Sequence, residues 1–393
     1  MMCVICGNVC KTCLDLNKQP LANNLLTNKR DDYELFNLGL EYCTNCGHGQ
    51  LTEFVSPKIL FSHYLYASGT SGTLDKYFSD FADNIIRKHG VESKVLDIAS
   101  NDGSFLKKLV AKGVVSLGVD PAENLVKKAI AESIFTICDF FPSRKINEKF
   151  DVITAMNVCA HTPDPLDFLV GVRDCLVENG RAYIQTSQAL MLNSGQFDTI
   201  YHEHFSFFTV SSMKEACRKV GLHLVNYELV DIHGISVIFH LAREANVSEE
   251  LFDSDIVKST SPLMTNSLVE ETYSLFKSKA QTTINTTKEH IERLREQGYE
   301  IVMAGVAAKA MTFYHAADFS CDYFIDEAEL KIGRYIPGED NSILDFYSLP
   351  EGGKYLIIVG AWNFFKEIKE KLVSNYPQSE LKFMRYFPDV VVE

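Results

Sequence analysis

The stretch VLDIASNDGSFL, residues 95–106, decides the fold of this chain. Val95 to Ile98 is typical of a short buried strand, residues 100–103 form a turn of small residues, and Ser104 opens a helix. A strand, a tight turn and a helix present backbone N–H groups to a ligand at the carboxyl edge of an α/β sheet. Gly103 lets the helix begin close to the strand, whereas Ala99 stands where a glycine is usual. The stretch predicts an α/β core with a ligand site at its strand ends.

The strands expected next place polar side chains at the same edge. Residues 115–119 end in Asp120, residues 134–138 lead into Asp139 and Phe140, and residues 150–154 lead into Asn157. An acidic residue about 20 positions past the glycine turn can bond both hydroxyls of a ribose. The turn has no Lys-Ser/Thr pair, so it is not a P-loop.

These strand ends suit an adenosine with a small amino-acid tail, which is S-adenosylmethionine (SAM). A dinucleotide site and a bare doubly wound core remain the alternatives. The cofactor-binding residues expected at the turn and the strand ends are Asp97, Ser100, Asn101, Asp102, Gly103, Asp120, Pro121, Asp139, Phe140 and Asn157.

Composition limits the class of protein. A chain of 393 residues is long enough for two or three domains, and no apolar run reaches the length of a membrane span. We expect a cytoplasmic protein without a signal peptide. A net charge of −14 argues against general nucleic-acid binding, which needs a basic face. Eleven cysteines in such a chain indicate metal binding or core thiols rather than disulfides.

The N-terminal cysteines predict a zinc site. Two Cys-x-x-Cys knuckles on separate hairpins supply the four thiolates that a closed structural site needs. The expected metal ligands are Cys3, Cys6, Cys43 and Cys46. Cys10 and Cys13 form a rival first knuckle, but a glycine follows Cys6 as it follows Cys46. We expect Cys10 and Cys13 to be free thiols and His48 to lie at the surface.

The rest of the chain divides around this core. A helical period covers residues 74–89, a helix is expected over 166–177 and a strand over 181–186, and residues 246–297 are mostly polar and helical. A second α/β unit begins at Tyr299, with a turn at Gly305. We expect a zinc module at 1–66, a SAM domain at 67–241, and a helical linker with a C-terminal Rossmann-like domain at 242–393.

A second chemical motif lies at Tyr201-His202-Glu203-His204. Four such side chains in a row are costly to bury without partners, and consecutive residues cannot all face one metal ion. Proton transfer suits them better, because histidine titrates near neutral pH and a glutamate can orient it. A solvated polar loop is the alternative, against which the aromatic flanks argue. His161 follows the fourth strand, at the edge where sites form.

With these residues in view, the chain resembles the SAM-dependent sugar C-methyltransferases of deoxysugar biosynthesis. The resemblance covers nearly the full length. It rests on the cysteine knuckles, on residues 19–23, 64–71, 96–103, 118–122, 160–161, 197–204 and 233–236, and on Gly305-x-Ala307-x-Lys309, Pro337-Gly338 and Ala361-Trp362-Asn363. The Tyr-His-Glu-His run is the specific part.

The resemblance implies a nucleotide-linked ketosugar, held between domains and methylated on the carbon next to its carbonyl. That carbon is most often C3 of a 4-keto-6-deoxy sugar. His204 would be the base and Glu203 would orient it, whereas contacts to the enolate and hydroxyls would come from Tyr201, His161, Tyr64 and Tyr66. Departures from the family pattern are Ala99, Phe207, Ile235 and Tyr77. Ala99 bears on SAM binding, and the other three bear on the identity of the sugar more than on the reaction.

Two other functions remain open. An O- or N-methyltransferase on the same scaffold would not need a substrate that forms an enolate. A zinc-bearing interaction protein with an inactive SAM fold would not bind SAM. We expect no nucleic-acid or membrane partner, and either a monomer or a weak dimer.

Overall fold

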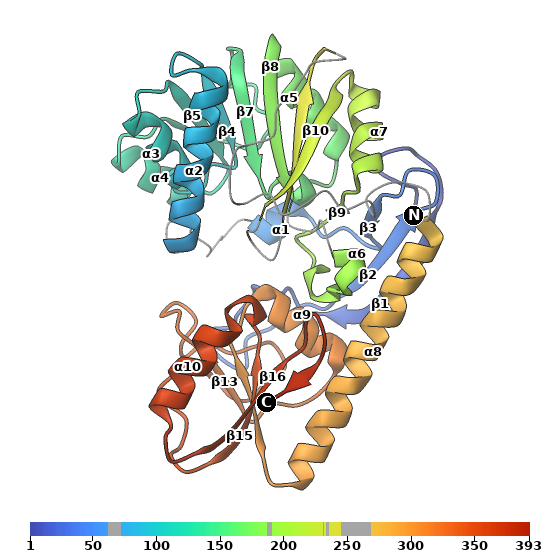
Figure 1. The fold of residues 1–393 in the computed structure, drawn as a ribbon, viewed down its shortest axis with the longest axis vertical. Coiled ribbons are helices and arrows are strands. Elements are labelled where there is room, and N and C mark those ends of the chain that lie inside the picture. The colour runs from blue at the N-terminus through green and yellow to red at the C-terminus, as the bar shows by residue number, and fades with distance from the viewer. Residues whose placement is uncertain (62–71, 187–190, 231, 233–235, 245–268) are drawn as a thin grey trace.

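The computed structural model describes residues 1–61, 72–186, 191–230, 232, 236–244 and 269–393. These residues form three sheets. Figure 1 shows the seven-stranded sheet at the top, the sheet of the N-terminal module below it at one side, and the C-terminal sheet at the bottom. No helix in these ranges is long and apolar enough to cross a membrane.

The N-terminal module is a four-stranded antiparallel sheet whose last strand comes from the middle of the chain. Its order is β1-β2-β3-β9. β9 pairs with β3 through Gly49 opposite Phe207 and Gln50 opposite Ser206. The elements are β1 (Cys10–Gln19), β2 (Phe36–Cys43), β3 (Gly49–Leu51), β9 (Ser206–Phe207) and the short helix α1 (Pro57–Phe61).

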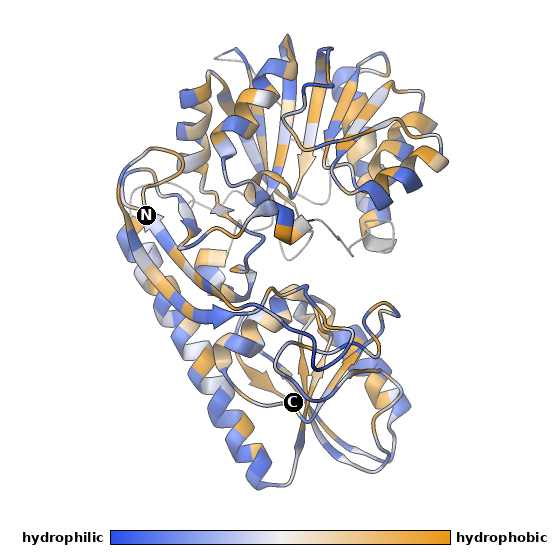
Figure 2. Ribbon diagram, turned by 180° about the vertical axis from the view of Figure 1, so that it is seen from behind, coloured by the Kyte–Doolittle hydropathy of each residue, from blue (hydrophilic) through white to orange (hydrophobic). Residues whose placement is uncertain are grey.

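The middle domain is a seven-stranded sheet of order β10-β11-β8-β7-β4-β5-β6, parallel except for β11. Its apolar strands appear as orange bands in Figure 2. The strands are β4 (Val95–Ile98), β5 (Ser116–Asp120), β6 (Thr136–Cys138), β7 (Phe150–Met156), β8 (Leu176–Thr186), β10 (His223–Val230) and β11 (Ser236–Ala242). The helices are α2 (Gly72–His89), α3 (Ser104–Ala111), α4 (Glu123–Ala131), α5 (Pro165–Cys175) and α7 (Val210–Val220).

One expected boundary in this domain is wrong. The helix expected over 166–177 ends at Cys175, and Leu176 already belongs to β8, where it pairs with Phe150 of β7. Leu176 is fully buried between strands, so tertiary pairing overrides the helical period at this point.

The C-terminal domain is a six-stranded sheet of order β14-β13-β12-β15-β16-β17, in which only β17 is antiparallel. The strands are β12 (Glu300–Ala304), β13 (Tyr323–Asp326), β14 (Ile343–Asp345), β15 (Lys354–Val359), β16 (Glu380–Arg385) and β17 (Val391–Val392). Two helices cover it, α9 (Ala308–Ala317) and α10 (Phe365–Asn375). A second parallel, Rossmann-like sheet therefore stands opposite the first.

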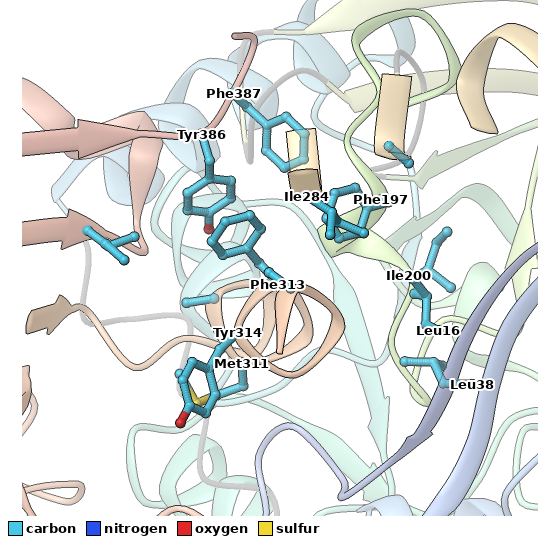
Figure 3. Close-up of a cluster of buried hydrophobic side chains, with 14 of the residues drawn as sticks. Leu16, Leu38, Phe197, Ile200, Ile284, Met311, Phe313, Tyr314, Tyr386 and Phe387 are labelled. Atoms are coloured by element: carbon cyan, nitrogen blue, oxygen red, sulfur yellow. The ribbon is translucent and has the colours of Figure 1, made fainter. Parts of the chain in front are cut away.

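Helix α8 (Val269–Glu296) joins the module to the C-terminal domain and runs along one side of the molecule (Figure 1). Its residues Phe276 and Ile284 belong to a core that all three parts of the chain share. Figure 3 shows Leu16 and Leu38 of the module in this core, with Phe197 and Ile200 and with Phe313 and Tyr386 of the C-terminal domain.

His48 is buried, against the expectation of a surface residue. Its Nε2 lies 3.2 Å from the Ser206 hydroxyl, and its ring packs 5.0 Å from the ring of Phe208. Burial lowers the pKa of His48 to about 3. The pairing of β9 with β3 explains the burial, because it carries residues 206–208 over the second cysteine knuckle.

Candidate functional site

A cavity of about 1290 Å³ lies where the three parts of the chain meet. Its walls come from residues 21–25 of the module, from the carboxyl ends of β4, β5 and β7, and from Tyr201, Glu203 and His204. The carboxyl ends of β12 and β15 close it from the other side, with Val306 and Gly360. Two parallel sheets therefore present their ligand-binding edges to one space.

The turn after β4 is held in an uncommon backbone conformation. Ala99 has φ 57° and Asn101 φ 52°, and Asn157 after β7 has φ 56°. All three are left-handed, a region that costs a residue other than glycine about 1–2 kcal/mol. All three line the cavity. Backbone strain of this kind is concentrated at functional sites. Ala99 therefore adopts the conformation that a glycine would adopt, at a cost in free energy, and the shape of the turn is kept.

Asp120 ties this turn to the neighbouring strand. Its Oδ2 accepts the backbone N–H of Asn101 at 2.9 Å, and its Oδ1 accepts that of Ala122 at 2.8 Å. The carboxyl group is buried, which raises its pKa, while the two N–H donors oppose that shift. A cofactor that bonds to Asp120 would meet a carboxylate already oriented by the backbone.

Asp97 is the second buried carboxyl group of the turn. Thr154 donates to its Oδ1 at 2.6 Å. Burial raises the pKa of Asp97 to about 7, and the Thr154 hydrogen bond opposes the shift. Asp97 lines the cavity at the end of β4, where it can accept a hydrogen bond from a ligand amine.

Two buried polar atoms at this edge have no hydrogen-bond partner among the residues that the structure describes: Ser100 Oγ and Asn157 Oδ1. Both residues line the cavity. A buried polar atom without a partner is costly, so a ligand with hydrogen-bonding groups fits this place. The residues that would hold SAM at this edge are Asp97, Ser100, Asn101, Asp120, Pro121 and Asn157, with Asp139 and Phe140 at the rim.

Asp102 and Gly103 do not line the cavity, contrary to expectation. Asp102 is almost fully buried, where it pairs with Lys128 at 2.7 Å and accepts the Ser104 hydroxyl. A Cβ atom on Gly103, which has φ 77°, would lie 3.1 Å from Ile134. Both residues therefore stabilise the turn without facing the cavity. The sequence pattern does not distinguish residues that stabilise a turn from residues that contact a ligand.

The loop of residues 197–204, which carries the Tyr-His-Glu-His motif, is bonded to both the N-terminal module and the C-terminal domain. β9 extends the module's sheet directly after the motif, and His202 Nε2 donates to the Phe36 carbonyl at 3.4 Å. On the other side, Trp362 Nε1 donates to Asp198 Oδ2 at 3.0 Å. His202 does not line the cavity, whereas Tyr201, Glu203 and His204 do.

His204 has the geometry of a neutral base. Its Nδ1 lies 2.7 Å from the Thr199 carbonyl oxygen. A carbonyl only accepts, so Nδ1 carries the ring proton and the lone pair is on Nε2. Burial holds the pKa of His204 well below its usual value, and the charge of a neighbouring His161 would lower it further. The His161 and Tyr201 rings lie 4.8 and 4.0 Å from the His204 ring. His161 is half-buried, and desolvation lowers its pKa to about 4.

Among the described residues, Thr199 and not the expected Glu203 contacts Nδ1 of His204. Glu203 is 6% exposed, and its Oε1 accepts a hydrogen bond from Asn23 Nδ2 at 2.5 Å. Burial raises the pKa of Glu203 to about 7, and the Asn23 donor opposes the shift. Tyr64 and Tyr66, also expected here, and His233 lie outside the described residues.

The four cysteines of the predicted zinc site converge. Their sulfur atoms all lie within 4.8 Å of one another, with Cys3 and Cys46 3.6 Å apart and Cys6 and Cys43 3.3 Å apart. Sulfurs bound at about 2.3 Å to a tetrahedral ion lie about 3.8 Å from one another, so the residues fit Zn²⁺. Cys13 instead donates to the Tyr273 carbonyl at 3.4 Å. Four protein ligands leave no open position, which makes the site structural.

Comparisons with known proteins agree with this architecture. A zinc binding domain model matches residues 3–61, a methyltransferase domain model matches 70–227, and a C-methyltransferase C-terminal domain model matches 231–388. Together the three models cover most of this chain. It is 30% identical to the C-methyltransferase NovU of Streptomyces niveus, over 62% of this chain and 61% of NovU. The chain thus spans less than two thirds of that relative's length.

Other relatives match smaller shares of the chain. A ubiquinone biosynthesis O-methyltransferase of Glaesserella parasuis is 31% identical over 28% of this chain and 50% of its own length. A solved SAM-dependent methyltransferase from Clostridium acetobutylicum aligns with 42% of this chain and 91% of that protein, at 14% identity and a TM-score of 0.35.

Several residues that line the cavity were not predicted from the sequence. Lys309, Lys331 and Trp362 line the cavity from the C-terminal domain, and Asn23 lines it from the zinc module. Lys309, Trp362 and Asn23 occur in motifs that mark the family resemblance, but a motif does not tell which distant motif it faces. Gly118 was also missed: a Cβ there would lie 2.4 Å from Ser100 Oγ, so only glycine lets the turn approach β5.

Proposed function

We propose that this protein uses SAM to methylate a carbon of a nucleotide-linked keto-deoxysugar, at C3 of a 4-keto-6-deoxyhexose. The observation that carries the proposal is His204, a buried neutral histidine with Nε2 available, in the same cavity as the cofactor edge. The C-methyltransferase C-terminal domain and the relative NovU support transfer to carbon.

The chemistry assigns a role to each side chain. A carbon next to a ketone becomes a nucleophile when a base removes its proton, and donors must then hold the enolate oxygen. His204 Nε2 takes the proton. Tyr201 and His161, whose rings contact that of His204, are the described donors for the enolate oxygen. SAM, when bound, supplies an electrophilic methyl group. The walls of the cavity hold the substrate in line with it, and such positioning accounts for much of the rate.

The second sheet edge supports a nucleotide-linked substrate. Asp326 at the end of β13 accepts the Val306 N–H at 2.7 Å and the Ala328 N–H at 2.8 Å, the same pattern that Asp120 makes at the end of β5. Lys331 pairs with Asp326 at 2.9 Å, and Lys331 and Lys309 both line the cavity. Two lysines at a nucleotide-type edge suit a diphosphate, in a chain whose net charge is −14.

An O- or N-methyltransferase is the second candidate, since 28% of this chain is 31% identical to a ubiquinone biosynthesis O-methyltransferase. That reaction would need no proton removed from carbon. An inactive SAM fold would instead fail to bind SAM in calorimetry.

The test is a screen of nucleotide-linked ketosugars with methyl-labelled SAM, combined with deuterium exchange. We expect label on carbon in at least one 4-keto-6-deoxyhexose. We also expect the protein to exchange the α-proton of that sugar for deuterium without SAM. Label on oxygen or nitrogen, with no exchange, would favour the second candidate.

A further inference from the structure

The zinc module contacts the loop of residues 197–204 and the strand β9 that follows it. One contact is the pairing of β3 with β9, and the other is a side chain between β1 and β2. Residues 21–25 form part of the cavity wall, and they lie between β1 and β2 at the end of the hairpin away from the cysteines. This segment is fixed on its far side, because Leu26 and Tyr335 exchange backbone hydrogen bonds of 2.8 and 2.9 Å. A side chain on the segment is therefore held at a set position relative to the loop.

Asn23 is that side chain. Its Nδ2 donates to Glu203 Oε1 at 2.5 Å, across 180 positions of the sequence. Glu203 is buried, and Asn23 is the hydrogen-bond partner that the described residues give its carboxyl group. Within the segment, the Leu25 N–H donates to the Asn23 carbonyl at 3.1 Å, which fixes the backbone behind the amide.

We propose that Asn23 is a positioning residue, which holds Oε1 of Glu203 so that Oε2 is presented to a hydroxyl group of the sugar. The inference rests on the proposed function for the identity of the ligand. It assigns the zinc module a part in the catalytic centre: the module folds around its metal and supplies the amide that fixes Glu203.

The physical basis is the cost of burying a carboxylate. A buried carboxyl group favours its neutral form, and a hydrogen bond donated to it favours the ionised form. The hydrogen bond from Asn23 therefore favours the ionised form of Glu203. The titratable groups that line the cavity with Glu203 come from every part of the chain around it. They are Tyr201 and His204 on its own loop, Tyr77 of α2, Asp97 of β4, Asp120 of β5, Asp139 after β6, His161, Asp164 and Asp167 after β7, and Lys309 and Lys331 of the C-terminal domain.

The first test is a titration of Glu203 by ¹³C NMR on carboxyl-labelled protein, with Glu203→Gln to assign the signal. Asn23→Leu should raise the pKa of Glu203 by about one unit, because it removes a hydrogen bond to a charged group. Asn23→Asp, which keeps the shape and adds a like charge, should raise it further. The control is Asn28→Ala, an exposed amide in the same connection between β1 and β2, which bonds to Asp31 at 3.3 Å and should leave the titration unchanged.

A double-mutant cycle on methyl transfer is the second test. If Asn23 acts through Glu203, Asn23→Leu should lower kcat/KM in the wild type but cause no further loss in Glu203→Gln. An unchanged Glu203 titration in both Asn23 variants, or independent losses in the cycle, would overturn the proposal. A protein that transfers no methyl group to any ketosugar would contradict the proposed function instead, and the titration would still decide the role of Asn23.

Discussion

Asp198 is a buried carboxyl group that connects the loop of residues 197–204 to the C-terminal domain. Burial raises its pKa to about 6, which the charge of Lys309 and the Trp362 hydrogen bond oppose. Its Oδ1 has no hydrogen-bond partner in the part of the chain that the structure describes. The loop is thus held by a group whose ionisation weakens the folded state.

This group makes stability depend on pH in a defined direction. Because the pKa of Asp198 is higher in the folded than in the unfolded protein, its ionisation opposes folding above about pH 4 and fully so above about pH 6. Asp198→Asn removes that cost. The free energy of unfolding of the variant, relative to the wild type, should therefore rise by about 1–2 kcal/mol between pH 5 and pH 8. Urea unfolding at both pH values measures this, and a difference that does not change with pH would contradict it.

Asp120, which we propose bonds to the cofactor, also accepts hydrogen bonds from two backbone N–H groups. Asp120→Ala should weaken SAM binding by about 1.5–3 kcal/mol, the range for a hydrogen bond to a charged group. Asp120→Asn keeps one acceptor oxygen and should lose less. Calorimetry with SAM gives both affinities. Equal SAM affinity in the wild type and Asp120→Ala would place the cofactor elsewhere.

At the scale of elements, the shared core of Figure 3 connects the loop to the C-terminal domain. The Phe313 ring stacks on that of Tyr386 at 3.8 Å and lies 6.1 Å from that of Phe197, next to Asp198. Phe313 is fully buried, so Phe313→Ala leaves a cavity under the loop.

Phe313→Ala should lower the free energy of unfolding by about 3–5 kcal/mol, as large-to-small changes of a buried phenylalanine do. The matched control is Leu275→Ala on α8, where the side chain is 54% exposed and the change should stay within about 0.5 kcal/mol. Chemical unfolding of both variants measures the difference. Similar values for the two would show that this core contributes little.

The elements themselves could largely be predicted from the sequence. The strand at 95–98 and the helix from Ser104 have the expected starts, because hydrophobic period and turn residues are local signals. Local signals gave wrong predictions where a distant strand determines the structure. Leu176 pairs with β7 instead of continuing a helix, and the pairing of β9 with β3 buries His48. The cofactor edge was predictable for a similar reason, since parallel strands end at one edge.

At the scale of the whole molecule, the sequence could not predict which parts meet. Glu203 was expected to contact the adjacent His204, but it bonds to Asn23, and Asp198 bonds to Trp362. These partners are 180 and 164 positions apart, and no periodicity links positions that distant. For the same reason, the sequence does not predict that Lys309 and Lys331 of the C-terminal domain line the cavity.

The zinc module connects distant parts of the molecule, because its sheet includes β9 and it supplies Asn23. Purified protein should hold one zinc per chain, and Cys46→Ser should lose most of it and unfold the module. Cys13→Ala should keep its zinc, since Cys13 contacts the Tyr273 carbonyl rather than the cluster. Elemental analysis of the two variants decides. Zinc lost from Cys13→Ala but kept by Cys46→Ser would overturn the assigned ligands.

The most direct test of the proposed chemistry is deuterium exchange at the α-carbon of a nucleotide-linked ketosugar, without SAM, in wild type and His204→Asn. Exchange needs the base but not the methyl donor. The variant should still bind SAM, yet exchange and methylate about 10²–10⁴-fold more slowly, the usual effect of removing a general base. Exchange at the wild-type rate in His204→Asn would contradict the assignment and show that another group removes the proton.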